Sequence, residues 1–443
     1  MSAKERSLPT HRISRFSKFA SLASLATRVA GNVIAEGTKQ IAKGNKPKAK
    51  DLLLTPQNIA RLTDQLAHLR GAAMKLGQML SMDAGDVLEP ELADILSRLR
   101  SNADPMPAKQ LNAVMESSLG TNWKAEFLSF NFKPIASASI GQVHQAYSDA
   151  GDNLAVKVQY PGIRKSIDSD VDNVGTLLKV VGLIPESVDY KGLLEEAKKQ
   201  LHDEADYARE AQFAIRYNDA LKEHPHFVVP KIHTGSCSDS VLAMEFIDGS
   251  PIEQIEHYDQ STRDFVMHSL LELLFRELFE FKMVQTDPNF ANYLYIENTR
   301  QIGLLDFGAT REYSERFSTG YRQAFASVVN NNEQGLNDAL EQIGFFSQTI
   351  LPDQRQAILD LVKMACEPML VDEPYDFKAS CLAQKLREAG TILSMEQEYW
   401  HTPPADALFL HRKIGGMYLL AARIGAKVNI RQLVQPYLTI NSE

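Results

Sequence analysis

Four polar residues follow one another along this chain in an order that constrains its fold more than any other feature. Lys157 lies within the sequence Ala-Val-Lys-Val, a short alternating segment that is typical of a β-strand. Asp287 and Asn292 stand in a polar segment, and Asp306 directly follows an apolar run that is also typical of a strand. A strand lysine can reach phosphate oxygens, and Mg²⁺ prefers oxygen ligands. These residue types, in this order, predict a site for a nucleotide and its magnesium ion.

Each of these residues also has an ordinary interpretation when it is taken alone. A lysine within a strand is more often a solvent-facing charge than a phosphate ligand. Asp287 and Asn292 fit a common turn, and the tripeptide Asp-Phe-Gly at 306–308 is short enough to occur by chance. The order of these residues is stronger evidence than any one of them. Protein kinases place a strand lysine, a catalytic loop with aspartate and asparagine, and an Asp-Phe-Gly segment in this same order along the chain. In that arrangement Asp287 would orient the nucleophile, while Asn292 and Asp306 would bind Mg²⁺.

A continuous helix is predicted over residues 190–222, and it contains three candidate carboxylate partners for the strand lysine. Glu204 and Asp206 are two residues apart, so on a straight helix they point about 200° apart and cannot both face one cation. Glu210 lies one turn beyond Asp206 on the same face. A solvated, charged helix is the alternative interpretation of this pattern.

The segment before the strand lysine departs from the kinase pattern. Kinases use a glycine-rich loop here, so that backbone N–H groups can approach the phosphates. This chain has instead Ala136-Ser-Ala-Ser-Ile-Gly-Gln-Val-His144, with Gly141 as its only glycine. Either the loop binds nucleotide in another way, or the chain is not an active kinase.

Taken together, these motifs resemble the UbiB family of atypical kinases, which supports ubiquinone biosynthesis. The resemblance extends from about residue 60 to the C-terminus. Within the family, the chain resembles the branch that contains the mitochondrial ubiquinone-biosynthesis ATPases. It implies an α+β, bilobal protein-kinase-like fold, with an N-terminal helical extension and a mostly helical C-lobe. The segments that carry it are Lys75-Leu-Gly-Gln78 (the KxGQ motif), the alanine-rich loop 136–144, Lys157, Glu204-Ala-Asp206 (the ExD motif), Gln285–Asn292, Asp306-Phe-Gly308 and His411-Arg-Lys-Ile-Gly-Gly416.

The resemblance also implies a role for each site residue. Lys157 would bind the phosphates of ATP with Glu210 as its helix partner, and Asp287 would be the catalytic-loop aspartate. The KxGQ extension would lie over the site, where a protein substrate would otherwise sit, which implies an ATPase or a kinase of small molecules. Its gating residues would be Lys75 and Gln78, facing Glu204 and Asp206. Further ATP contacts would come from Ala136, Ser137, Ala138, Ser139, and the hinge residues Glu245 and Ile247; Mg²⁺ would be held by Asn292 and Asp306.

Four parts are expected along the chain. They are a basic amphipathic head and linker (1–50), a helical KxGQ extension (51–132), a kinase-like N-lobe (133–247) and a kinase-like C-lobe (248–443). Helices are predicted over 14–35, 55–80, 91–100, 107–119, 190–222 and 262–283, with strands at 154–158, 226–232, 241–247, 293–296 and 302–305. Beyond Thr310 the pattern is almost entirely helical.

The head is basic although the chain as a whole is acidic. Residues 1–50 hold eleven lysines and arginines and only two acidic residues, whereas the net charge of the chain is −9. An apolar stripe runs over 14–35, which suits an anionic membrane surface; a helix docked on the protein's own body is the alternative. The acidic net charge argues against a general nucleic-acid binder. The expected partners are therefore nucleotide, anionic membrane lipids and ubiquinone-biosynthesis enzymes.

The expected location follows from the cysteines and the hydropathy. Three scattered cysteines suit a reducing compartment, and no apolar run is long enough to span a bilayer. We expect a cytoplasmic protein that binds peripherally to the inner membrane, with the matrix side of an organelle as the alternative. The expected function is an ATP- and Mg²⁺-dependent ATPase or atypical kinase. The alternative is a pseudokinase scaffold that binds nucleotide without catalysis.

Overall fold

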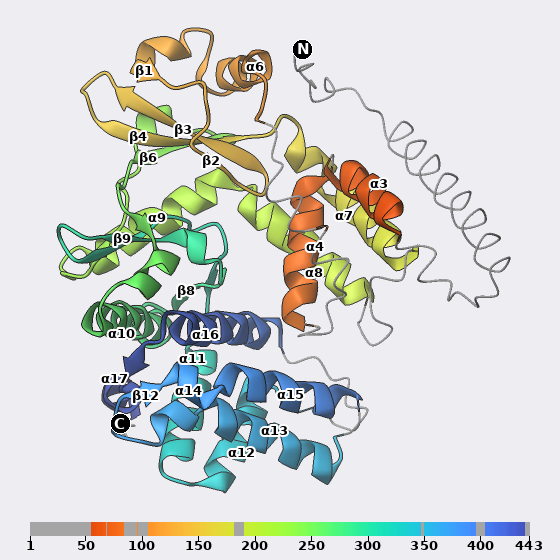
Figure 1. Cartoon of the computed structure of the whole chain (residues 1–443), viewed down its shortest axis with the longest axis vertical. Helices are drawn as coiled ribbons and strands as arrows, with labels where there is room; N and C mark the ends of the chain where they lie inside the picture. The colour runs from red at the N-terminus through yellow and green to blue at the C-terminus, as the bar shows by residue number, and fades with distance from the viewer. Residues whose placement is uncertain are drawn as a thin grey trace, which may run out of the picture. The chain divides into compact units, whose positions relative to one another are not determined.

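The computed structural model describes residues 55–67, 69–83, 95, 105–180, 190–346, 350–395 and 404–438. It divides into two compact units (Figure 1). Unit 1 reaches Ala211 and also includes Ile232–Phe246; unit 2 comprises Gln212–Lys231 and everything from Ile247 onward. The helices predicted over 14–35 and 91–100, and the linker 44–51, lie outside the described residues or almost entirely so.

Unit 1 is built on a five-stranded antiparallel sheet in the order β1-β3-β4-β6, with β2 paired to β3. Its strands are β1 (Phe127–Phe130), β2 (Ala136–Ser137), β3 (Gly141–Ser148), β4 (Asn153–Gln159) and β6 (Val241–Glu245). The alternation in β4 places Leu154, Val156 and Val158 in one core, together with Trp123 and residues of α6 (Ala108–Leu119). The strand predicted at 154–158 and the helix predicted at 107–119 are both confirmed.

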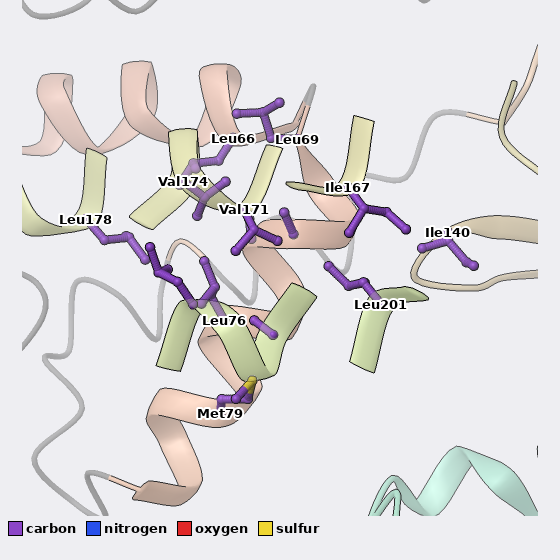
Figure 2. Close-up of a cluster of buried hydrophobic side chains, with 14 of the residues drawn as sticks. Leu66, Leu69, Leu76, Met79, Ile140, Ile167, Val171, Val174, Leu178 and Leu201 are labelled. Carbon is purple, nitrogen blue, oxygen red and sulfur yellow. The ribbon is translucent and has the colours of Figure 1, made fainter. Parts of the chain in front are cut away.

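The second core of unit 1 lies among four helices. They are α3 (Pro56–Ala67), α4 (Arg70–Asp83), α7 (Ile163–Val180) and α8 (Tyr190–Glu204). Thr55 begins α3 as predicted, since its Oγ1 accepts the N–H of Asn58 over 3.3 Å. Figure 2 shows one cluster that contains Leu76 and Met79 of α4, Val171, Val174 and Leu178 of α7, and Leu201 of α8. The predicted helix 55–80 is therefore two helices, which share this core.

The prediction of one continuous helix over 190–222 is wrong, because this segment forms two helices. Helix α8 ends at Glu204, and α9 (Tyr207–Leu221) begins after a short break. Asp206 starts the new helix, because its Oδ1 accepts the N–H of Arg209 over 3.1 Å and its carbonyl accepts the N–H of Glu210. Aspartate is a favoured N-cap residue, so local capping outweighs the continuous helical pattern.

Unit 2 contains a four-stranded sheet in the order β5-β10-β9-β7 and a separate pair, β8 with β11. The bounds are β5 (Phe227–Val228), β7 (Ser250–Pro251), β8 (Met283–Gln285), β9 (Tyr293–Ile296), β10 (Gln301–Leu304) and β11 (Thr310–Glu312). Strand β9 has the predicted bounds, and β10 corresponds to the strand predicted before Asp306. Strand β11 is a short exception to the prediction that the chain beyond Thr310 is almost entirely helical.

The rest of unit 2 is mainly helical. Its helices are α10 (Gln260–Arg276), a π-helical turn (Glu277–Phe281), α11 (Glu315–Val329), α12 (Glu333–Ile343), α13 (Pro352–Ala365), α14 (Phe377–Ser380), α15 (Leu382–Met395), α16 (Ala405–Ile424) and α17 (Ile430–Leu438), with a small strand pair β12 (Tyr375–Asp376) and β13 (Lys427–Val428). All three cysteines are free. Among the described helices, none is both long and apolar enough to cross a membrane.

Candidate functional site

In unit 1, the strand lysine is buried and paired. Lys157 lies between Val143 of β3 and Leu242 of β6 in the sheet register, and its Nζ donates to Oε1 of Glu210 over 2.6 Å. The two side chains are only 10% and 2% exposed, so the lysine is not a solvent-facing charge. Burying two charges costs free energy that their attraction often fails to recover. A functional role therefore explains this pair better than a contribution to stability.

The break between α8 and α9 determines which carboxylates lie where. Glu210 is in the first turn of α9, the helix that Asp206 begins. Glu204 ends α8, and its two oxygens have different partners. Oε1 accepts a hydrogen bond from Nζ of Lys75 over 2.5 Å, and Oε2 accepts one from Oγ of Ser139 over 2.6 Å. The two acidic residues of the ExD motif thus have different partners. Glu204 joins the KxGQ helix to the alanine-rich loop, while Asp206 caps α9.

Helix α4 packs directly against the alanine-rich loop. A Cβ built on Gly71 of α4 would lie 2.9 Å from the carbonyl oxygen of Ser139 and 3.4 Å from Cγ2 of Ile140, so this close approach requires glycine. Ile140 is buried in the same core as Leu76 of α4 (Figure 2). Helix α4 therefore meets the loop directly at Gly71 and is linked to it at Lys75 through Glu204. Gln78 also lies on α4; its side chain is outside the described part of the structure.

Gly141 and His144, in the second half of the loop, have structural roles. Gly141 begins β3, and a Cβ there would lie 2.4 Å from the carbonyl oxygen of Val158, so the sheet pairing itself requires glycine. His144 is fully buried, with Nδ1 2.8 Å from the carbonyl oxygen of Asn131 and Nε2 2.8 Å from the amide nitrogen of Gln142. Burial lowers the pKa of His144, which suits a neutral ring that donates from Nδ1 and accepts at Nε2. The loop's one glycine thus serves the sheet.

In unit 2, the predicted catalytic-loop residues contact one another. The Asn292 amide nitrogen donates to Oδ2 of Asp287 over 3.0 Å, and Asn292 is only 8% exposed. This hydrogen bond uses the amide nitrogen of Asn292 and leaves its amide oxygen as the side-chain atom that could bind a metal ion. The N–H of Leu305, next to Asp306, donates to the carbonyl of Asn292 over 3.0 Å. The two segments that carry Asp287 and Asp306 are therefore joined through their backbones.

The Asp-Phe-Gly segment is ordered by local contacts and by packing. Oδ1 of Asp306 accepts the N–H of Gly308 over 3.0 Å. Phe307 is 2% exposed, and its ring lies 4.8 Å from that of Tyr217, centroid to centroid. Strand β11 follows and pairs with β8, with Thr310 opposite Gln285. Asp306 thus lies on a turn whose neighbours are fixed by a buried aromatic pair and a strand ladder.

A buried charged network lies beside the catalytic loop. Lys413 of α16 is 2% exposed, and its Nζ donates to the Tyr293 hydroxyl over 2.5 Å and to Oε1 of Gln285 over 3.2 Å. Glu277 is 1% exposed, and its Oε1 accepts the hydroxyl of Tyr217 over 2.6 Å and the N–H of Gln285 over 3.3 Å. We define these five residues as the Lys413 network. Gln285 lies two residues before Asp287, so the network supports the start of the catalytic loop.

The charges of this network balance one another. Burial raises the pKa of Glu277, and the nearby Lys413 opposes that change. For Lys413, burial alone lowers the pKa, but the Tyr293 hydroxyl and the Glu277 carboxylate raise it above its ordinary value. The ammonium therefore stays charged. Helix α16 also touches the loop directly, because a Cβ on Gly416 would lie 2.5 Å from Cβ of Pro288.

The structure brings the predicted site residues together within each unit. Unit 1 joins Lys157 to Glu210, and Lys75 to Glu204; unit 2 joins Asp287 to Asn292 and, through the backbone, to the segment of Asp306. The predicted hinge residues divide between the units, since Glu245 ends β6 in unit 1 and Ile247 begins the next part of unit 2. Neither Glu277 nor Lys413 was predicted as a site residue. The only signal was that Lys413 lies in the C-terminal segment 411–416 that resembles a family motif.

Comparisons with known proteins agree with this organisation. Residues 98–340 match the family model described as the ABC1 atypical kinase-like domain. The chain is 38% identical over 432 residues to "Atypical kinase COQ8, mitochondrial" of Saccharomyces cerevisiae, which covers 97% of this chain and 85% of that protein. It is 35% identical over 435 residues to "Atypical kinase COQ8B, mitochondrial" of Rattus norvegicus, covering 98% and 81%.

A solved structure supports the fold. The complex of Rv3197 with erythromycin from Mycobacterium tuberculosis has a TM-score of 0.61 at 26% identity, and the match covers 87% of this chain and 97% of that one. The fold and the motifs together define a protein-kinase-like protein. More narrowly, the chain belongs to the ABC1 family of atypical kinases, also called the UbiB family.

Proposed function

We propose that this protein is an ATP- and Mg²⁺-dependent ATPase or atypical kinase that supports ubiquinone biosynthesis at a membrane surface. The observation that carries the proposal is the buried Lys157–Glu210 pair, 2.6 Å apart, on the central sheet of unit 1. A cation held this way by a carboxylate is the part of a kinase site that binds the α- and β-phosphates. The predicted Mg²⁺ ligands, Asn292 and Asp306, are in unit 2.

The residues of unit 2 fit a magnesium ion by their chemistry. Asp306 offers a carboxylate and Asn292 an amide oxygen, and both are hard ligands of the kind that Mg²⁺ prefers. The bound ion would neutralise charge on the phosphates during transfer. Asp287, held by the Asn292 amide nitrogen over 3.0 Å, would orient the attacking hydroxyl or water and accept its proton. Lys157 would bind and orient the phosphates.

The contacts of the KxGQ helix support a restricted substrate range. Lys75 pairs with Glu204, and Glu204 also holds Ser139 of the alanine-rich loop. Lys75 and Glu204 have side chains that are 7% and 18% exposed, so their attraction is weakly screened by solvent. Helix α4 is thus held against the loop that a kinase uses to cover phosphates. This favours water or a small acceptor over a protein substrate.

The role in ubiquinone biosynthesis rests on the family. The relatives named COQ8 and COQ8B are described as mitochondrial atypical kinases, and the alignments cover nearly all of this chain. We propose that this chain acts in ubiquinone biosynthesis, either on lipid-like intermediates or together with enzymes of that pathway. The corresponding location is the inner membrane surface, on the cytoplasmic side or on the matrix side of an organelle.

One observation favours a second candidate function, a pseudokinase scaffold. The alanine-rich loop lacks the glycines of an active kinase, and its only glycine is required by the sheet. Phosphate release from Mg-ATP distinguishes the two candidates when it is measured with and without anionic liposomes. Release in either condition supports the ATPase. Stabilisation of the protein by nucleotide with no release in both conditions supports the scaffold.

The alanine-rich loop makes a specific prediction. Ala138→Gly is expected to change the ratio of the affinities for ATP and ADP by roughly two- to five-fold, because glycine opens backbone conformations that alanine resists. The measurement is calorimetric titration with each nucleotide. Ala150→Gly, in the exposed β3–β4 turn of the same unit, is the matched control and is expected to leave both affinities unchanged. Unchanged affinities in Ala138→Gly would show that residues 136–144 do not contact nucleotide.

A second prediction concerns the basic head. Deleting residues 1–40 is expected to weaken binding to anionic liposomes at least about ten-fold, since several positive charges near the surface each contribute roughly 1 kcal/mol. Liposome sedimentation measures the binding, and thermal unfolding checks that the remainder is folded. Neutral liposomes serve as the control, and neither form is expected to bind them strongly. Equal binding of both forms to anionic liposomes would contradict a membrane role for the head.

A further inference from the structure

A cluster of potential metal ligands lies in unit 2 outside the residues discussed so far. His224 and His226 flank Pro225 on the turn before β5, and Glu272 is on α10. One ligand atom from each of the three lies within 4.8 Å of the others. Sequence spacing did not point to this group, because Glu272 is far from the two histidines along the chain. The group is partly buried, with the His224 and Glu272 side chains 12% and 34% exposed.

The geometry points to a binding site for a zinc-type divalent cation at His224, His226 and Glu272. Two imidazoles and a carboxylate form a donor set that zinc uses with water as its fourth ligand. On a tetrahedral zinc ion with bonds of about 2.0–2.1 Å, neighbouring ligand atoms are about 3.4 Å apart. Nε2 of His224 and Oε1 of Glu272 are already 3.5 Å apart. No ligand atom in the group is more than 4.8 Å from another, so the longer distances need to shorten by at most about 1.4 Å, which side-chain rotation can supply.

His226 gives an independent reason to place a ligand here. Its Nδ1 is buried and has no hydrogen-bond partner within the described part of the chain. Its ring is held edge-on by Phe265, with the centroids 4.9 Å apart, and lies 5.3 Å from the ring of His224. A buried polar atom without a partner is costly, and a bound ion is one of the few features that account for it.

Metal binding would also have one local cost. Nδ1 of His224 accepts the backbone N–H of His226 over 3.3 Å. A neutral imidazole that binds metal through Nε2 carries its proton on Nδ1, so this long hydrogen bond would be lost. The cation must therefore replace one weak interaction with three bonds. That exchange favours a strongly bound ion such as Zn²⁺ over Mg²⁺, which dehydrates reluctantly and prefers oxygen ligands.

The position of the site suggests what it does. The carbonyl of His226 accepts the N–H of Ile302 over 2.8 Å, and β5 pairs in parallel with β10. Strand β10 ends at Leu304, two residues before Asp306. A cation bound to Glu272 as well would tie α10 to the sheet edge that leads to the Asp-Phe-Gly segment. The ion would therefore cross-link these two segments of unit 2, separately from any ion bound with nucleotide.

Cobalt and zinc titrations of the full-length protein test the site. After chelation and dialysis, Co²⁺ is expected to give the visible absorption of a tetrahedral ion, and one equivalent of Zn²⁺ is expected to abolish that absorption. His226→Phe keeps a ring against Phe265 and Glu272→Gln keeps the shape of the side chain, and each is expected to weaken zinc binding at least about 30-fold. His257→Phe is the matched control, since exposed His257 also lies 3.5 Å from a carboxylate, that of Glu256, but lies outside the three-ligand group.

The outcomes are distinct. Zinc is expected to raise the melting temperature of the wild type and the control but not of the two site variants. Absence of the cobalt absorption in the wild type would overturn the proposal, whatever the variants do. Equal zinc affinity in all four proteins would also overturn it, because the ion would then be bound elsewhere. Metal-free melting temperatures of the variants show whether each is folded.

Discussion

Replacing Asp306 by asparagine is expected to lower the rate of phosphate release from Mg-ATP at least about 100-fold, the effect of losing one charged group that acts on the transition state. The substitution removes the negative charge and preserves the shape. Its Oδ1 can still accept the N–H of Gly308, which Asp306 does over 3.0 Å. Phe307 remains buried against Tyr217, so the turn is expected to stay folded. The loss of turnover would then report on the metal ligand itself.

The control for Asp306→Asn replaces another aspartate of unit 2 by asparagine. Asp338 is exposed on α12, where it accepts a hydrogen bond from the side chain of Gln334. Asp338→Asn is expected to leave turnover and melting temperature unchanged. Raising the Mg²⁺ concentration is expected to recover part of the lost rate in Asp306→Asn. Wild-type turnover in that variant would contradict the assignment of Asp306 as a metal ligand.

Replacing Lys413 by methionine is expected to destabilise the protein by about 3–5 kcal/mol, because it leaves the buried Glu277 carboxylate without its balancing charge. Glu277 is 1% exposed, and its Oε2 has no hydrogen-bond partner among the described residues. The variant also removes the donor to Tyr293 and Gln285. Because Gln285 leads into the catalytic loop, kcat is expected to fall while the KM for ATP changes little. Denaturant unfolding and steady-state kinetics measure the two effects.

Two further variants test whether Lys413 differs from an exposed lysine that forms a surface ion pair. Lys427 is 48% exposed and pairs with Asp376 over 3.1 Å, so Lys427→Met is expected to cost no more than about 1 kcal/mol. Combining Lys413→Met with Glu277→Leu removes both buried charges and is expected to recover part of the lost stability. If Lys413→Met and Lys427→Met had equal effects, Lys413 would not be part of a coupled buried network.

The residues at the centre of the candidate site were predictable because their motifs are local. Strand alternation placed Lys157, and the apolar run before Asp306 placed the Asp-Phe-Gly segment after a strand. The spacing of Asp287 and Asn292 matched the kinase catalytic-loop pattern, and the structure adds a direct hydrogen bond between them. In each case the chemistry depends on a few residues close in the sequence. Short-range patterns therefore carry most of the information.

The features that were not predicted depend on contacts between distant segments or on competition between local preferences. The helical pattern over 190–222 hides the break at Asp206, where capping of α9 prevails over continuation of α8. Lys413 meets Gln285 and Tyr293 across more than a hundred residues of chain, which no periodicity reveals. The sequence did not show what the one glycine of the alanine-rich loop does, and the close approach of the Val158 carbonyl shows that it serves the sheet.

The affinity for ATP with and without Mg²⁺ tests most directly whether residues of both units bind one nucleotide. The proteins to compare are the wild type, Asp306→Asn, and Lys157→Met combined with Glu210→Gln, which removes both members of the buried pair together. The combined variant is expected to bind ATP at least about ten-fold more weakly in either condition, since it loses a charged contact to phosphate. Asp306→Asn is expected to lose only the part of the affinity that Mg²⁺ adds. Wild-type affinity in the combined variant, or an undiminished Mg²⁺ effect in Asp306→Asn, would contradict a shared nucleotide and magnesium site.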